Sequence, residues 1–90
     1  VVVDVSGRSV LAWDVAMPSS KIGGFDSELV REFFHALARE GRLTIHVRLL
    51  AGHNTHHVAE AIFKALGRAL RQATELDERR SGIPSTKGHL

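Results

Sequence analysis

The strongest structural signal in this sequence is a strand pattern that leads directly into a helix pattern. From Leu43 to Leu49, apolar side chains occupy every second position, as in a strand with one buried face. Asn54 or Thr55 can then cap a long helix, from about residue 55 to 76, in which apolar side chains recur every three or four positions. This pair of patterns predicts a sheet with a helix packed against it.

Two apolar segments near the start of the chain are typical of further strands. Residues Val1 to Val5 are apolar and β-branched at most positions, and Ser9 to Met17 begins as an apolar run and then alternates. Ser6-Gly7, between them, is a short turn signal. We therefore expect the two strands to pair as a hairpin.

A loop and a second helix follow these strands. Residues Pro18 to Gly24 collect Pro, Ser and Gly, which favour a loop. Asp26 or Ser27 can cap the helix, and Gly41 is expected to terminate it as the residue that turns left-handed just beyond the helix.

The order of elements is therefore β-β-α-β-α, within a single domain of residues 1–90. Short connections between elements in this order predict an α+β fold of two layers, a small mixed sheet covered on one face by two helices. A domain of 90 residues buries only about 60% of the surface that its unfolded chain exposes. Its stability is expected to depend on a partner or a metal ion.

The composition excludes several classes of protein. No apolar run approaches the roughly 20 residues that a membrane span needs, and the absence of cysteine excludes disulfides and thiolate metal sites. The first residues lack the features of a signal peptide, so a cytoplasmic setting is expected. A net charge of only +2 argues against nucleic-acid binding. The few aromatic side chains are expected in the core, which leaves none on which bases could stack.

His56, His57 and Glu60 form the clearest chemical pattern. On a helix, Glu60 lies three and four residues after the two histidines, so both imidazoles can approach its carboxylate. Adjacent histidines point about 100° apart around the helix axis, so two metal ions, each completed by another segment or chain, fit better than one. The alternative is a solvated first turn, with Glu60 favoured by the helix dipole and paired with Lys64.

Two further segments are candidate phosphate ligands. Arg8 follows the Ser6-Gly7 turn, although an arginine in such a place is more often a surface residue. Ser85 to Gly88 offers two hydroxyls, the Lys87 ammonium and a free backbone amide, which suits a phosphate. A tail without regular structure is the alternative explanation for that segment.

Longer stretches of the sequence carry a family resemblance. These are VDVSGR, GGFDSELVREFF, LTIHVRLLAG, GHNTHHVAEAIFKALGRALRQA and GIPSTKGHL. Together they resemble the C-terminal part of imidazoleglycerol-phosphate dehydratase, the lyase of histidine biosynthesis. That family is built from two similar halves, each with a His-His-x-x-Glu helix, and this chain looks like the second half.

The resemblance implies roles for individual residues. His56, His57 and Glu60 look like manganese ligands, with two ions in a complete site. Glu32 lies 24 positions before His56, where many members carry a further histidine ligand, and a carboxylate is an acceptable manganese ligand. Glu60 and Lys64 are the candidate catalytic residues. Arg8, Ser85 and Lys87 match the residues that hold the substrate phosphate.

The family removes water from imidazole glycerol phosphate to give imidazole acetol phosphate. The implied mechanism has the metals bind the substrate imidazole as imidazolate, which makes loss of a neighbouring C–H proton feasible, while a carboxylate shuttles protons. This chain lacks the first His-His-x-x-Glu, so a complementary N-terminal half or a second copy in a homo-oligomer is expected to supply the missing ligands. The rival interpretation is a non-catalytic half-domain that metal ions bridge into oligomers.

Overall fold

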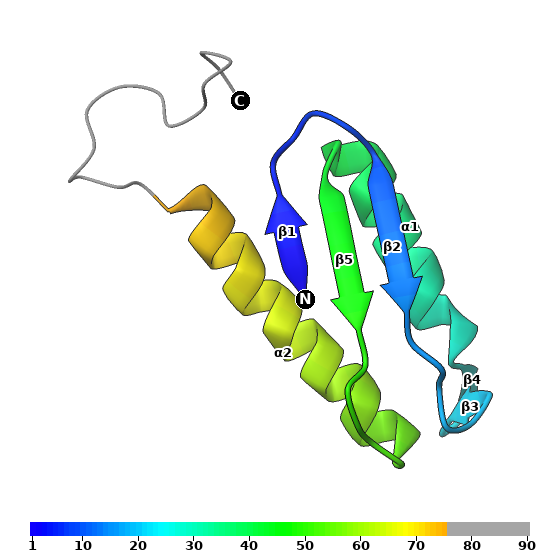
Figure 1. Ribbon diagram of the computed structural model, residues 1–90. Helices are drawn as coiled ribbons and strands as arrows, with labels where there is room; N and C mark the ends of the chain where they lie inside the picture. Colours follow the sequence, from blue (N-terminus) through cyan, green and yellow to red (C-terminus); the bar gives the residue numbers. More distant parts are fainter. Residues whose placement is uncertain (76–90) are drawn as a thin grey trace.

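The computed structural model describes residues 1–75 of the chain (Figure 1). Five short strands and two helices follow one another. In chain order they are β1 (Val2–Asp4), β2 (Val10–Asp14), β3 (Lys21–Ile22), β4 (Phe25–Asp26), α1 (Glu28–Gly41), β5 (Thr44–Arg48) and α2 (Thr55–Thr74). No helix within residues 1–75 combines the length and the apolar character that crossing a membrane requires.

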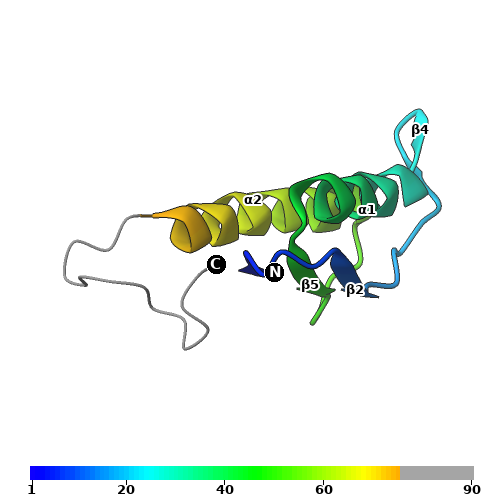
Figure 2. The ribbon, with the colours of Figure 1, turned by 90° about the horizontal axis from the view of Figure 1, so that it is seen from above.

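The main sheet has three strands in the order β1-β5-β2, with β1 antiparallel and β2 parallel to β5. Both helices lie on the same side of this sheet, as Figure 2 shows in the view along the layers. The predicted α+β architecture of two layers, a small mixed sheet covered on one face by two helices, is confirmed.

The predicted hairpin of the first two strands is wrong, because β5 lies between them. Val3 and Leu11 both face Ile45 in the register, from opposite sides of β5. Five residues separate the end of β1 from the start of β2, and this connection spans the width of β5 instead of making a tight two-residue turn. In the central place, β5 has Ile45 and Val47 almost completely buried.

The core lies between the sheet and the two helices. Phe34 of α1 is fully buried, and its ring packs against Trp13 of β2 with centroids 5.4 Å apart. Each helix contributes buried side chains at the spacing of one helical face. The buried apolar residues are Ile22, Val30, Phe34, Ala38, Leu43, Ile45, Val47, Val58, Ala59, Ile62 and Leu66.

Helix α1 begins close to the predicted cap but ends differently. Ser27 occupies the cap position, but its side chain makes no hydrogen bond to the helix, and Oδ1 of Asp26 instead accepts a hydrogen bond from the Glu28 amide at 3.0 Å. The left-handed residue is Arg42 and not Gly41, which is the last residue of the helix. A Cβ on Gly41 would lie 3.1 Å from Cγ of Leu43, so the glycine allows a close approach of that side chain.

Residues 18–24, expected as a loop, contain half of a small hairpin. Strands β3 and β4 pair antiparallel around Gly23 and Gly24, and Ile22 enters the core. Gly23 has φ 58°, a left-handed conformation that glycine adopts without strain. Two glycines between apolar residues are a hairpin signal, which the sequence analysis missed.

Candidate functional site

The first three turns of α2 bring three of the predicted site residues into one row. Nε2 of His56 lies 3.5 Å from Oε2 of Glu60, and Nζ of Lys64 donates a hydrogen bond to Oε1 of the same carboxylate at 2.9 Å. All three side chains are open to solvent, with 68%, 51% and 73% of their surfaces exposed. The carboxylate of Glu60 is therefore the centre of an accessible group of nitrogen and oxygen donors.

The sequence places this row through the helix start. Asn54 is extended, and its Oδ1 accepts a hydrogen bond from the His57 amide at 3.0 Å, which fixes where the helix begins. From that point the spacing of four residues puts His56, Glu60 and Lys64 on successive turns of one face. Of the two predicted caps, Asn54 is the one observed.

Lysine and histidine charges keep Glu60 ionised. The hydrogen bond from Lys64 is the main cause that lowers the pKa of Glu60, and the positive charge of Lys64 adds to it. Desolvation opposes the shift, and His56 and His57 each lower the pKa of Glu60 by a smaller amount. An ionised carboxylate with one oxygen turned to Lys64 and the other to His56 is suited to act as an anionic ligand.

His57 has different surroundings from His56. The two ring centroids are 5.9 Å apart and the ring planes are inclined by 69°. His57 lines a hollow of about 220 Å³ at the end of β5, together with Leu49, Gly52 and His53. The neighbouring imidazoles thus face different spaces, as the helix geometry predicted, and His53 is a hollow-lining residue that the sequence analysis did not single out.

The remaining predicted metal ligand lies on the other helix. Glu32 is exposed on α1. Within residues 1–75, no group of three or more His, Asp or Glu side chains comes together in a way that could hold a metal ion. His56, His57 and Glu60 therefore do not form a complete metal-binding cluster within the described residues, and their ligand roles, like that of Glu32, stay predictions.

Arg8 lies far from the start of α2 along the sheet. It belongs to the connection between β1 and β2, beside the first residue of β5, since Val10 pairs with Thr44. Helix α2 follows the other end of β5. Figure 1 shows the β1–β2 connection at one end of the sheet and the start of α2 at the opposite end. Ser85 and Lys87, the other predicted phosphate ligands, lie outside the described residues.

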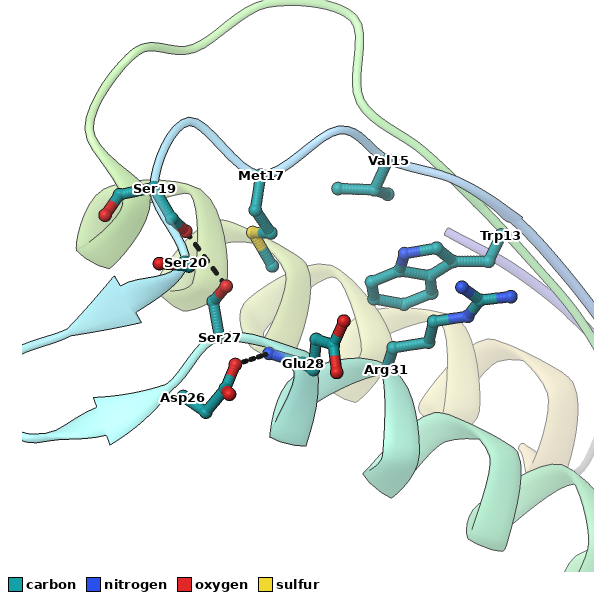
Figure 3. A pocket seen from close by; sticks show the side chains of 9 residues that line it. All are labelled: Trp13, Val15, Met17, Ser19, Ser20, Asp26, Ser27, Glu28 and Arg31. Carbon is teal, nitrogen blue, oxygen red and sulfur yellow. Dashed lines mark hydrogen bonds between the residues drawn. The ribbon is translucent and has the colours of Figure 1, made fainter.

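A larger hollow, of about 400 Å³, lies where β2, the β3–β4 hairpin and α1 meet. Trp13, Met17 and Arg31 line it, with the Ser27 hydroxyl turned to the Ser19 carbonyl oxygen at 2.9 Å (Figure 3). None of the predicted site residues lines this hollow. It is separate from the row of His56, Glu60 and Lys64 on α2, which we call the donor row.

A comparison with protein families adds to this geometry. The model of the imidazoleglycerol-phosphate dehydratase family matches residues 1–70. This chain belongs to that family. The match includes the donor row of α2, the β1–β2 connection that contains Arg8, and all five strands. The predicted family resemblance is confirmed.

Individual members of the family are similar over nearly the whole chain. The imidazoleglycerol-phosphate dehydratase of Dinoroseobacter shibae is 64% identical over 97% of this chain and 45% of its own length. That of Moorella thermoacetica is 59% identical over 100% of this chain and 46% of its own length. The chain thus spans about half the length of these relatives.

Solved structures agree with the fold. The dehydratase of Pyrococcus furiosus is 45% identical, with a TM-score of 0.82 over 98% of this chain and 48% of that one. The dehydratase of Staphylococcus aureus is 53% identical, with a TM-score of 0.74 over 76% of this chain and 40% of that one. The two-layer unit therefore matches somewhat less than half of each of these chains.

Proposed function

We propose that this chain is one half of a dehydratase that converts imidazole glycerol phosphate to imidazole acetol phosphate in histidine biosynthesis. The complete site holds two manganese ions and forms between half-domains or subunits, in a cytoplasmic homo-oligomer or with a complementary N-terminal half. Family membership supports the reaction, and the incomplete donor set supports the sharing.

The separation of Arg8 from the α2 donors carries the proposal of a shared site. Both are expected to act on one small substrate, yet they lie at opposite ends of β5, whose five residues span about 13 Å. In one copy, Arg8 and the α2 histidines lie at opposite ends of the sheet, which favours a substrate held between two halves. In this proposal, the end of one half that carries Arg8 meets the end of another half that carries His56 and His57.

The donor chemistry of α2 suits manganese. Nε2 of His56 and Oε2 of Glu60 face each other, and imidazole nitrogen with carboxylate oxygen is a ligand set that manganese accepts. His57 serves the second ion, and Glu32 of a neighbouring half is the further carboxylate candidate. When bound, the ions supply Lewis acidity that makes loss of a C–H proton next to the substrate imidazole feasible.

The Glu60–Lys64 pair handles charge and protons in this proposal. The Lys64 ammonium donates to Oε1 at 2.9 Å and lowers the pKa of Glu60, whose ionised carboxylate is the group that shuttles protons. A positive group fixed beside the reacting centre also stabilises negative charge as it develops. Arg8, with Ser85 and Lys87, holds the substrate phosphate through charge-assisted hydrogen bonds.

The helical layer offers a surface on which another half can pack. Phe33 of α1 and Phe63 of α2 are 47% and 40% exposed, and their ring centroids are 5.3 Å apart. Leu29, one turn before Phe33, is also exposed. Large apolar side chains gathered on a surface favour burial against a partner.

The rival proposal is a non-catalytic half-domain whose histidines bridge chains through metal. The solvent exposure of His56 and Glu60 favours it, because exposed donors are accessible to another chain without any substrate. Both proposals require metal, so metal binding alone does not separate them.

Dependence of turnover on protein concentration separates the two. A shared catalytic site follows the mass action of assembly, so activity per chain should fall steeply over about a thousandfold dilution and rise when the N-terminal half is added. Glu60→Gln should abolish turnover, because it removes the anionic ligand and keeps the shape. Constant activity per chain from a proven monomer would contradict sharing. No turnover with manganese and the N-terminal half present would favour the non-catalytic alternative.

A further inference from the structure

The backbone of Arg8 is held on both sides by two hydroxyl groups. The Arg8 amide donates to Oγ of Ser6 at 3.1 Å, and Oγ of Ser6 donates to the Arg8 carbonyl oxygen at 3.2 Å. Oγ1 of Thr44, on β5, lies 2.7 Å from Oγ of Ser6 and makes a longer contact of 3.5 Å to the Arg8 carbonyl oxygen. We call Ser6 and Thr44 the hydroxyl pair.

The hydrogen-bonding capacity of the pair matches this arrangement. A serine hydroxyl donates one hydrogen bond and accepts two. Oγ of Ser6 accepts from the Arg8 amide, and either hydroxyl can be the donor in the contact between Ser6 and Thr44. With Thr44 as that donor, the Ser6 hydroxyl gives its own hydrogen to the Arg8 carbonyl oxygen. The pair thus joins a turn to a strand 38 residues further along the chain.

The connection needs such bonds to hold one conformation. Arg8 is exposed and lies outside both neighbouring strands, so no ladder hydrogen bond fixes it. Gly7 has φ 78° and is free to adopt other conformations. Thr44, by contrast, is half-buried in the central strand and is a rigid anchor.

We infer that Ser6 and Thr44 are positioning residues that fix Arg8 for the substrate phosphate. This inference rests on the phosphate role of Arg8 in the proposed function. Neither hydroxyl touches the phosphate in this scheme. Both act by holding the arginine backbone in advance, so that binding does not have to order the turn.

The first test measures, by calorimetry, how tightly the assembled, manganese-loaded protein binds inorganic phosphate. Thr44→Val keeps a branched strand residue and removes the hydroxyl, and should weaken phosphate binding about 3- to 10-fold, the net worth of a hydrogen bond. Thr44→Ser restores the hydroxyl and should restore the affinity. Ser9→Ala is the matched control, because the Ser9 hydroxyl bonds the Arg39 carbonyl oxygen and not Arg8.

The arginine variant separates this inference from the proposed function. In an Arg8→Ala background, Thr44→Val should cause no further loss, since the pair acts only through the arginine. If Arg8→Ala itself leaves phosphate affinity unchanged, the phosphate role of Arg8 is wrong. If Arg8→Ala weakens binding but Thr44→Val and Ser6→Ala do not, the positioning inference alone is overturned.

Hydrogen exchange of the Arg8 amide tests the same contact without any ligand. Thr44→Val and Ser6→Ala should each speed exchange of that amide, whereas Thr44→Ser should not. The Ser6 amide, which bonds the Asp4 carbonyl oxygen at 2.9 Å, gives an internal reference in the Thr44 variants. Unchanged exchange at Arg8 in both Thr44→Val and Ser6→Ala would overturn the inference. Ser6→Ala is included because Ser6 lies outside the strands, so its result still applies if Thr44→Val disturbs β5.

Discussion

The two ends of strand β5 carry different kinds of functional group, held in different ways. At one end, the spacing of α2 alone brings His56, Glu60 and Lys64 together. At the other end, Arg8 is held by contacts between a turn and a distant strand. The donor end is therefore built from local geometry, and the arginine end from long-range geometry.

This difference predicts that the two ends respond independently to substitution. A change in the first turns of α2 should alter metal binding and leave the Arg8 connection unchanged. A change in the hydroxyl pair should do the reverse. Substitutions at each end test this independence.

Loss of a metal ligand should have the largest effect. His56→Ala and His57→Ala should each lower manganese affinity, because each removes a donor atom. Loss of a residue that only supports a ligand typically lowers metal affinity roughly 10- to 100-fold, so loss of a ligand should lower it by at least as much. Metal content per chain after dialysis is the measurement. His35→Ala, at an exposed position of α1, is the control and should retain the metal. Full occupancy in both α2 variants would end the metal interpretation.

Gly52→Ala should have the next largest effect, confined to the donor end. A Cβ at Gly52 would lie 2.8 Å from Cγ2 of Val58, and the φ of 150° strains any other residue. We expect a loss of about 1–3 kcal/mol in the free energy of unfolding, with weaker metal binding and unchanged exchange at the Arg8 amide.

Gly67→Ala is the matched control for this substitution. Gly67 lies within α2, and nothing surrounds its Cβ position within 4 Å. Alanine there should raise the free energy of unfolding by about 0.5–1 kcal/mol. Denaturant unfolding measures both variants. If Gly52→Ala is as stable as the unchanged chain, the contact with Val58 does not constrain the start of α2.

The smallest effect concerns the charge of Glu60. Lys64 lowers the pKa of Glu60, so the pair stabilises the fold at pH values above the ordinary pKa of a glutamate. That contribution is lost as the pH falls through the lowered pKa. Lys64→Met should raise the pKa of Glu60 toward its ordinary value, as followed by carboxyl NMR without metal. The stability difference between the two proteins should shrink on acidification. An unchanged pKa would show that the lysine is not the cause.

Most of the fold could be predicted from local patterns, and the main error was in strand pairing. Alternation identified β5, and periodicity with a capping residue identified α2, because these signals lie within a few neighbouring residues. The pairing of β1 with β5 depends on contacts between residues such as Val2 and His46, far apart in the chain. No local pattern records that pairing.

The candidate site divides in the same way. The approach of His56 and Lys64 to Glu60 follows from helical spacing, so the sequence predicted it. The contact of Ser6 with Thr44 requires knowledge of which strand lies beside the turn. The predicted hairpin, which put β2 in the place of β5, hid that contact.

The central position of β5 has a consequence for the order in which the chain folds during synthesis. Every pairing within the three-stranded sheet includes β5, so β1 and β2 have no partner in that sheet until residues 44–48 have left the ribosome. A hairpin would have closed as soon as its second strand emerged. Here both outer strands wait for a later segment, and such distant pairings close slowly. The nascent chain therefore carries two apolar strands without their partner while all of α1 is being made.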